Sequence, residues 1–351
     1  MQFLCLSPIE SFHWWPIKHH MGRSKLWVFL AALVLASGVL AGPSATAAGR
    51  YQPFTKGSYW RSQSDNRAAR NSKAMMSWLR SMLHTDRRFV TIRATNLNGS
   101  SAQGTTVYYA TENSPLYRIC HNPRYHKYYW PTDFDAVRIP KGARAPTDND
   151  ADMIVYNVFK RKVFWFTNMQ RINGRWCASQ ASVYHTDSNG LHGKLARSTN
   201  RHNWGKHGLA PITQAIRWGE VASGSIPHVM NVYIPAISCN RDDVFPLYTG
   251  TMCTTHAANS IPAGAILRIR PRANLSNYRL SPTARIIARA LKRYGAVVGD
   301  RSGVGNNVTI KLEDTAVEGK GNLWANAGLR FDSLRNIPLS AYRIDRLGAG
   351  R

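Results

Sequence analysis

The sequence is poor in acidic residues. Asp and Glu together number 19 against 46 Lys and Arg, so the chain carries a formal net charge of +27 at pH 7. A surface with this excess attracts polyanions, and salt screens the attraction. Outside a cell such polyanions include acidic polysaccharides, cell-wall polymers and anionic lipid surfaces. A well-solvated cationic surface explains the charge equally well, and charge carries no information on fold or reaction.

Several catalytic signatures are also missing. The chain contains no Gly-x-Ser-x-Gly turn, no phosphate-binding loop, no dinucleotide fingerprint and no His-Glu-x-x-His pair. His202 and His207 lie five positions apart around Trp204, whereas a zinc-binding helix places its two histidines at i and i+4. The sequence therefore predicts neither a serine hydrolase nor a zinc peptidase.

Only one long apolar run is present. Leu26–Leu40 follows Arg23 and Lys25, and a small-x-small cleavage pattern follows it at residues 45–47. These features are typical of a secretory signal peptide. We therefore predict a non-native upstream extension over residues 1–20, a signal peptide over 21–47 and a secreted chain over 48–351. A membrane anchor is the alternative, but the run is short, and no second segment is long enough to cross a bilayer.

Cysteine is rare, with five residues in the chain. Cys5 lies in the upstream extension, which leaves Cys120, Cys177, Cys239 and Cys253. An even number of cysteines in an exported protein favours disulfides. Cys239 and Cys253 close a short loop, so we predict that they pair, which leaves Cys120 with Cys177. Four cysteines allow three pairings, and a zinc site is disfavoured because no Cys-x-x-Cys spacing occurs.

Most of the secreted chain has the composition of short strands. β-branched and aromatic segments alternate with clusters of Gly, Pro, Asn and Asp, which predicts many strands and few helices. We expect a mainly β, antiparallel sandwich of jelly-roll type that forms a single domain over residues 48–351. The predicted strands are 88–94, 105–110, 135–140, 153–159, 162–167, 229–235, 265–270 and 308–312.

Two segments have helical periodicity instead. Residues 66–84 place apolar side chains on one face. The second helix begins after Ser281, a good N-cap, with Pro282 in its first position, and it ends at Gly295. Its basic residues line the face opposite the apolar stripe, which is typical of a solvated surface. They are Arg285, Arg289, Lys292 and Arg293.

An acid and a histidine flank one tight turn. Glu220 and His228 lie eight positions apart, with Gly224, Ser225 and Pro227 between them and a predicted strand after them. A glycosidase needs a pair of acid and base groups around a sugar ring, and a polysaccharide lyase needs a base and a cation. The alternative is structural: Glu220 caps a helical turn and His228 donates a hydrogen bond inside the fold.

A second acidic cluster precedes a predicted strand. Asp148, Asp150 and Asp152 alternate along the chain, so they lie on one side of an extended segment. They are candidates for a catalytic carboxylate or for a bound cation. Calcium is the only cofactor that this pattern suggests, but the glycine and the glutamate of a calcium loop are absent. A solvated acidic turn is the simpler interpretation.

Aromatic and basic residues mix in one loop. Residues 121–135 interleave rings with cations, a mixture that stacks on sugar faces and pairs with anionic groups. It would also suit single-stranded nucleic acid, which export disfavours, and a loop packed by its own rings is the structural alternative. The predicted substrate-binding residues are Tyr125, His126, Tyr129 and Trp130 from this loop, with Trp165, Trp204 and Arg217 from elsewhere.

Three stretches resemble a group of secreted bacterial proteins that is common in actinomycetes. They are residues 139–156, 208–232 and 283–303. The second contains a Gly-Leu pair and then Ile-x-x-x-Glu-x-x-x-Gly-x-Ile-x-His over residues 216–228, and the third contains Ala-Leu-x-x-Tyr-Gly-x-x-x-x-Asp over residues 290–300. The resemblance implies export and a shared β-rich architecture, and Glu220, His228 and Asp300 are its matching polar positions. Where the group has Asp-x-His, this chain has Asp150-Ala151-Asp152, and Trp165 replaces an acid.

These patterns lead to one expectation and two alternatives. We expect a secreted protein that cleaves an acidic polysaccharide, as a hydrolase or a lyase. The predicted catalytic residues are Glu220, His228, Asp150, Asp152 and Asp300. The first alternative is a non-catalytic cationic module that binds cell-wall or extracellular polyanions. The second is a secreted effector that acts on nucleic acid or on membranes.

Overall fold

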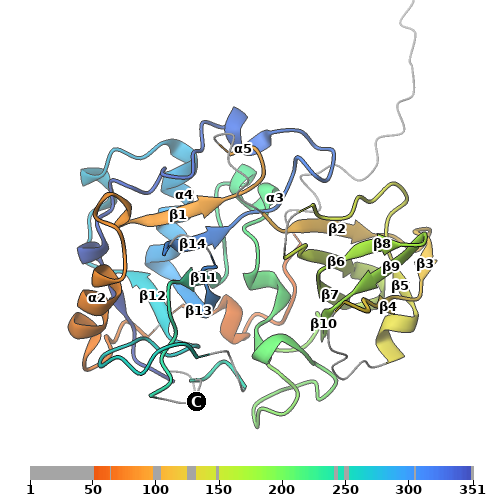
Figure 1. The fold of residues 1–351 in the computed structure, drawn as a ribbon, viewed down its shortest axis with the longest axis horizontal. Coiled ribbons are helices and arrows are strands. Elements are labelled where there is room, and N and C mark those ends of the chain that lie inside the picture. Colours follow the sequence, from red (N-terminus) through yellow and green to blue (C-terminus); the bar gives the residue numbers. More distant parts are fainter. Residues whose placement is uncertain are drawn as a thin grey trace, which may run out of the picture. The chain divides into compact units, whose positions relative to one another are not determined.

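The computed structural model describes residues 51–63, 65–97, 104–124, 132–147, 150–240, 244–248, 253–303 and 306–348. All of them belong to one compact unit, drawn in Figure 1. The unit is mainly β, with 26% strand and 20% helix. The predicted signal peptide, the upstream extension, Asp148, Tyr125, His126, Tyr129 and Trp130 lie outside the described residues.

The larger sheet has six strands in the order β1-β14-β11-β13-β12-β15 (Figure 1). Two neighbouring pairs, β1 with β14 and β11 with β13, are parallel. The other pairs are antiparallel. The strands are β1 (Val90–Arg93), β11 (Met230–Ile234), β12 (Ile266–Ile269), β13 (Ala296–Arg301), β14 (Val308–Lys311) and β15 (Tyr342–Ile344).

A second sheet has the order β10-β7-β6-β2, in which only β2 and β6 are parallel. Its strands are β2 (Thr106–Ala110), β6 (Met153–Asn157), β7 (Lys162–Thr167) and β10 (Gln180–His185). Two small sheets complete the set. They contain β3 (Leu116–Tyr117) with β5 (Val137–Arg138), and β4 (Cys120–His121) with β9 (Arg175–Ala178) and β8 (Gln170–Ile172).

The mainly β class and all eight predicted strands are confirmed, although most strands are shorter than predicted. The antiparallel jelly roll is not confirmed, because both larger sheets contain parallel pairs. Parallel neighbours require a crossover connection. Here β12 and α4 lie in the chain between β11 and β13, so a helix supplies that connection.

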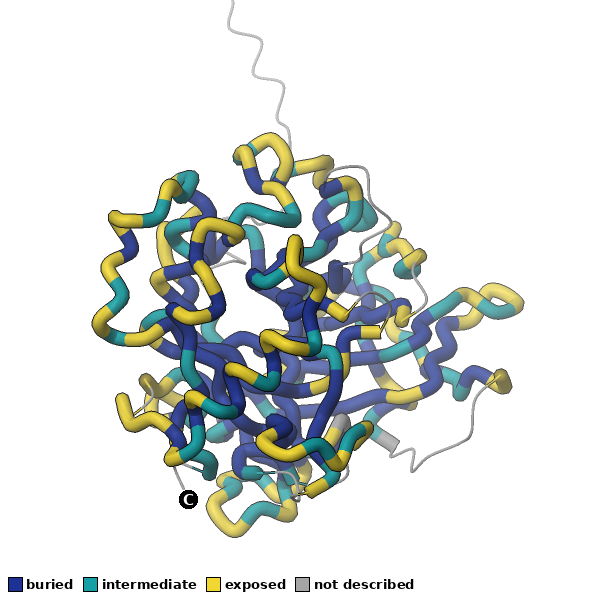
Figure 2. Tube along the Cα trace, turned by 60° about the vertical axis from the view of Figure 1, so that its left-hand side comes forward, coloured by how far each residue is buried: buried dark blue, intermediate teal, exposed yellow. Residues whose placement is uncertain are grey.

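Four α-helices occur in the described part of the chain: α2 (Ser72–Ser81), α3 (Trp218–Ala222), α4 (Pro282–Arg293) and α5 (Leu323–Asn326). Among these residues no helix is both long and apolar enough to cross a membrane. Buried side chains form two cores, the larger around the six-stranded sheet and the smaller on β2, β6, β7 and β10. Figure 2 shows the buried strands inside more exposed loops.

The segments that connect the two larger sheets are paired with each other. Thr105, just before β2, forms a parallel bridge with Glu313, just after β14. Ile216, just before α3, forms a second parallel bridge with Leu312. The ends of β2, β14 and α3 therefore meet at one place in the fold.

Helix α4 begins and ends as predicted. The Ser281 side chain accepts a hydrogen bond from the amide of Ala284 (3.2 Å), and Pro282 occupies the first turn. Gly295 follows the helix with φ at +77°, and a Cβ there would lie 2.5 Å from Ile266. Glycine is required at this position both for its conformation and for the close contact.

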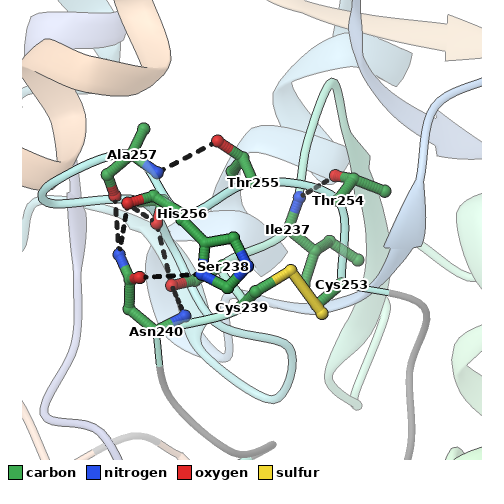
Figure 3. The surroundings of a disulfide bond; sticks show 10 residues. Ile237, Ser238, Cys239, Asn240, Cys253, Thr254, Thr255, His256 and Ala257 are labelled. Carbon is green, nitrogen blue, oxygen red and sulfur yellow. Dashed lines mark hydrogen bonds between the residues drawn. A yellow bond between two sulfur atoms is a disulfide. The ribbon is translucent and has the colours of Figure 1, made fainter.

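Both predicted disulfides are present, Cys120–Cys177 and Cys239–Cys253. Cys120 and Cys177 are also register partners in β4 and β9. Figure 3 shows how hydrogen bonds hold the loop around the second disulfide. Asn240 donates through Nδ2 to the carbonyl oxygens of His256 (2.9 Å) and Ala257 (3.0 Å). Disulfides are typical of proteins exported from the cytosol.

The two disulfides close loops of different length, 57 and 14 residues. Chain entropy predicts about 4 kcal/mol of stabilisation for the longer loop and about 3 kcal/mol for the shorter. We therefore expect the double variant Cys120→Ser/Cys177→Ser to lose more unfolding free energy in urea than Cys239→Ser/Cys253→Ser. The reverse order would contradict this account, and non-reducing peptide mapping checks the pairing.

Candidate functional site

Glu220 and His228 meet in space, as the sequence suggested. Arg217 is the residue before α3. The Glu220 carboxylate accepts a hydrogen bond from the Arg217 amide through Oε2 (3.0 Å) and another from the Arg217 guanidinium through Oε1 (2.5 Å). His228 Nε2 lies 3.0 Å from Glu220 Oε1 and 3.2 Å from Oε2. Gly224, with φ at +84°, reverses the chain between the two residues.

The three side chains are sealed inside the fold. Those of Glu220 and His228 are 0% exposed and that of Arg217 is 1% exposed. Arg217 also donates to the Tyr51 carbonyl (2.7 Å) and to the Tyr109 hydroxyl (3.2 Å). Burial alone would raise the pKa of Glu220, but Arg217 and His228 outweigh it and bring that pKa down to about 2.

This geometry favours a structural role for the pair. A carboxyl group with a pKa of about 2 is ionised at neutral pH, so it cannot donate a proton to a glycosidic oxygen. A polymer also cannot reach side chains without exposed surface. The carboxylate instead neutralises buried Arg217, the condition under which a buried ion pair is tolerated.

The predicted aspartates form a separate group. Asp152 at the start of β6 and Asp150 before it both accept from Lys311 Nζ, at 2.8 and 3.1 Å. Asp152 also accepts from Trp165 Nε1 (3.0 Å). Burial lowers the pKa of Lys311, but Asp152, Tyr233 and Asp150 raise it well above its ordinary value, so this lysine is charged.

Asp300 belongs to the same neighbourhood through Tyr233. It lies opposite Tyr233 in the pairing of β13 with β11 and is exposed. Burial raises the pKa of Tyr233, and Asp152, Asp300 and Asp150 add to that effect while Lys311 opposes it. The structure thus brings together the predicted catalytic residues Asp150, Asp152 and Asp300 around Lys311 and Tyr233, and it places Glu220 in a separate group with His228 and Arg217.

The described residues contain no group of three or more His, Cys, Asp or Glu side chains that could hold a metal ion. Asp150 and Asp152, the described members of the suggested calcium cluster, hold the ammonium group of Lys311 instead. A lysine between two carboxylates supplies the positive charge that a cation would otherwise provide.

The remaining predicted contact residues are mostly enclosed. Arg217 and Trp165 are buried, so neither can contact a polysaccharide. Trp204 is half-buried and packs on the smaller core, with its ring 6.1 Å from that of Phe134. The described members of the predicted substrate-binding set therefore contribute to packing rather than to a binding surface.

One further charged group has no recognisable pattern in the sequence. Lys320 Nζ lies 2.6 Å from both Glu313 Oε1 and Glu318 Oε2. Glu313 also accepts from the amide of Trp218 (2.6 Å), and Glu318 from that of Val107 (2.5 Å). Burial and the nearby Glu313 raise the pKa of Glu318 well above its ordinary value. The two glutamates, five positions apart, fasten α3 and β2 to the segment after β14.

A cavity of about 720 Å³ lies along α4. We call it the α4 groove. The turn Gly224–Pro227, between α3 and β11, and the segment from Pro271 to Leu275 also line it. No Asp or Glu occurs among its described lining residues. Its basic lining residues are Arg268, Arg285, Arg289, Lys292 and Arg293.

Four of these cations have no acidic partner in the part of the chain that the structure describes. Arg285, Arg289, Lys292 and Arg293 form no ion pair with any carboxylate that the structure describes. Their spacing of i, i+4, i+7 and i+8 places them along one stripe of the helix. The sequence pattern favours a solvated face for this stripe. In the structure the stripe borders a groove, because the Gly224–Pro227 turn lines the same cavity.

The depressed pKa of Glu220 makes a prediction about acid stability. A carboxylate whose folded pKa lies at about 2, below its ordinary 4.5, stabilises the fold above pH 4.5 and loses this contribution as the pH falls toward 2. We expect Glu220→Gln to lower the unfolding free energy at pH 7 by about 3–5 kcal/mol, because Arg217 keeps an uncompensated buried charge.

Urea unfolding between pH 2 and 7 measures both effects. The difference in stability between wild type and Glu220→Gln should shrink as the pH drops. Glu112→Gln, at an exposed carboxylate, is the matched control and should leave stability nearly unchanged at every pH. A Glu220→Gln protein as stable as wild type at pH 7 would refute the structural role.

Comparison of the chain with protein-family models gives no match. The curated proteins and the solved structures also give none.

Proposed function

We propose that the protein is a secreted cationic module that binds an anionic polysaccharide or cell-wall polymer along the α4 groove. The observation that carries the proposal is the stripe Arg285, Arg289, Lys292 and Arg293, which borders a cavity with no described acidic residue. Cations without an acidic partner attract anionic groups in a ligand without first breaking an internal ion pair.

The shape and chemistry of the groove support an extended ligand. Its volume of about 720 Å³ lies within the range of ordinary ligand sites, about 300–1,000 Å³. Arginine predominates among the basic residues, and its planar guanidinium pairs with carboxylate, sulfate or phosphate groups through two hydrogen bonds. Pro271, which is half-buried, adds apolar surface on which a sugar ring can lie.

Binding is better supported than cleavage. Glycoside hydrolysis needs two carboxyl groups that flank the bond, and the α4 groove has none among its described lining residues. The resemblance to secreted actinomycete proteins supports export and leaves the reaction open. The two disulfides fit an extracellular environment.

Removing two cations from the groove should weaken binding strongly. Charge-assisted hydrogen bonds contribute about 1.5 kcal/mol each, so Arg289→Ala/Arg293→Ala should lower affinity for dextran sulfate or alginate about a hundredfold at low salt. Added salt should weaken the wild-type complex, because it screens exposed charges. Titration calorimetry at several salt concentrations measures both effects.

The matched control is Lys141→Ala/Arg175→Ala, which removes the same charge from exposed positions outside the groove. It should retain most of the affinity. Equal losses in the two double variants would mean that net charge, and not the groove, attracts the polymer. Neutral dextran should not bind.

A product screen separates binding from cleavage. Incubation with neutral and acidic polysaccharides should yield neither new reducing ends nor the absorbance of unsaturated uronates. New ends that disappear in Asp150→Asn or Asp300→Asn would overturn the proposal in favour of a hydrolase or lyase at the aspartate cluster. These two residues are chosen because both are exposed, unlike Glu220.

A further inference from the structure

A smaller cavity of about 300 Å³ adjoins the α4 groove. We call it the tyrosine pocket. Its lining combines aromatic and apolar side chains with a few charged ones, in the way that small-molecule sites do. Its lining includes Tyr59, Gln63, Asp65, Tyr294, Asp345 and Arg346.

The pocket and the groove share one wall. Tyr294, the residue after α4, lines both cavities. Asp345 in the pocket faces Arg268 in the groove, with 3.4 Å between Oδ2 and Nη1. Gln63 in the pocket, with its amide oxygen toward α4, accepts from Arg293 at 2.9 and 3.1 Å. The two cavities therefore lie on either side of Tyr294, so that neighbouring rings of one polymer can occupy both.

The pocket presents aromatic surface together with hydroxyl groups. The ring of Tyr59 is fixed edge-on by Trp60 (5.4 Å between centroids) and Phe245 (5.1 Å). The hydroxyl groups of Tyr59 and Tyr294 form no hydrogen bond with any residue that the structure describes. Burial, with smaller effects of Asp345 and Asp65, raises the pKa of Tyr59, so its hydroxyl remains a donor.

The charges of the pocket differ from those of the groove. Asp65 and Asp345 both line it, and they are compensated by arginines: Asp65 by Arg346 (2.9 Å) and Asp345 by Arg343 (2.7 Å). Carboxylates repel anionic groups, and Asp65, whose side chain is partly exposed, can accept a hydrogen bond from a hydroxyl group, whereas Asp345 is buried behind the wall. The pocket therefore suits an uncharged, hydroxyl-bearing ring, and its volume is near the lower limit for ligand sites.

We infer that the tyrosine pocket binds an uncharged sugar ring of the same anionic polysaccharide whose charged groups lie in the α4 groove. The inference rests on the proposed function of the groove. It adds that the ligand is a glycan in which charged and uncharged rings occur together, rather than any polyanion of sufficient charge.

Two probes of similar charge test this inference. One is a hyaluronan octasaccharide, which alternates uronate with an uncharged amino sugar, and the other is inorganic polyphosphate, which has no sugar ring. We expect Tyr59→Phe/Tyr294→Phe to bind the oligosaccharide about tenfold more weakly and to bind polyphosphate unchanged. Arg289→Ala/Arg293→Ala should bind both ligands more weakly.

The control is Tyr117→Phe, which removes a hydroxyl outside both cavities and should change neither affinity. Thermal midpoints of all variants show whether each protein is folded. If the tyrosine variant binds the oligosaccharide like wild type while the arginine variant loses it, the pocket assignment fails and the groove proposal stands. If the arginine variant also binds normally, the groove proposal fails. Tighter binding of polyphosphate or single-stranded DNA than of the oligosaccharide would overturn the glycan assignment.

Discussion

The buried ion pair between Arg217 and Glu220, with His228 against it, is the constraint on which the shape of the α4 groove depends. Glu220 holds the start of α3, and His228 lies two residues before β11. The residues between them are the Gly224–Pro227 turn, which lines the α4 groove. Glu220 and His228 thus fix the two ends of the turn through their mutual contact. This buried contact therefore positions one wall of the groove.

Internal ion pairs also explain why the surface is so basic. Asp152 and Asp150 neutralise Lys311, Glu313 neutralises Lys320, and Asp345 accepts from two arginines. Burial of a charge requires such compensation. Since the chain has only 19 acidic residues, those bound to buried or half-buried cations are unavailable to the arginines of α4. The described lining of the α4 groove therefore carries positive charge and contains no acidic residue.

Local sequence patterns predicted individual strands and helices better than the way in which the strands pair into sheets. The caps of α4, the strand segments and the disulfides follow from short-range rules, and the structure contains them. Strand β13 was missed because it begins immediately after Gly295, where a strand start is hard to separate from a helix end. The contact of Lys311 with Asp152 spans 159 positions, and the mixed pairing likewise depends on tertiary packing. The sequence left a catalytic and a structural role open for Glu220 and His228, and the capping contact of Glu220 and the complete burial of both side chains favour the structural one.

The distribution of carboxylates separates recognition from catalysis at this surface. Proton transfer to a glycosidic oxygen needs an acid whose pKa is raised by an apolar or like-charged environment. The described lining of the α4 groove contains no Asp or Glu, and Asp65 and Asp345 in the tyrosine pocket are paired with arginines. In the complex that we propose, anionic groups along α4 and an uncharged ring beside Tyr59 would belong to one ligand, which is recognised by the alternation of charge along its length rather than by its total charge.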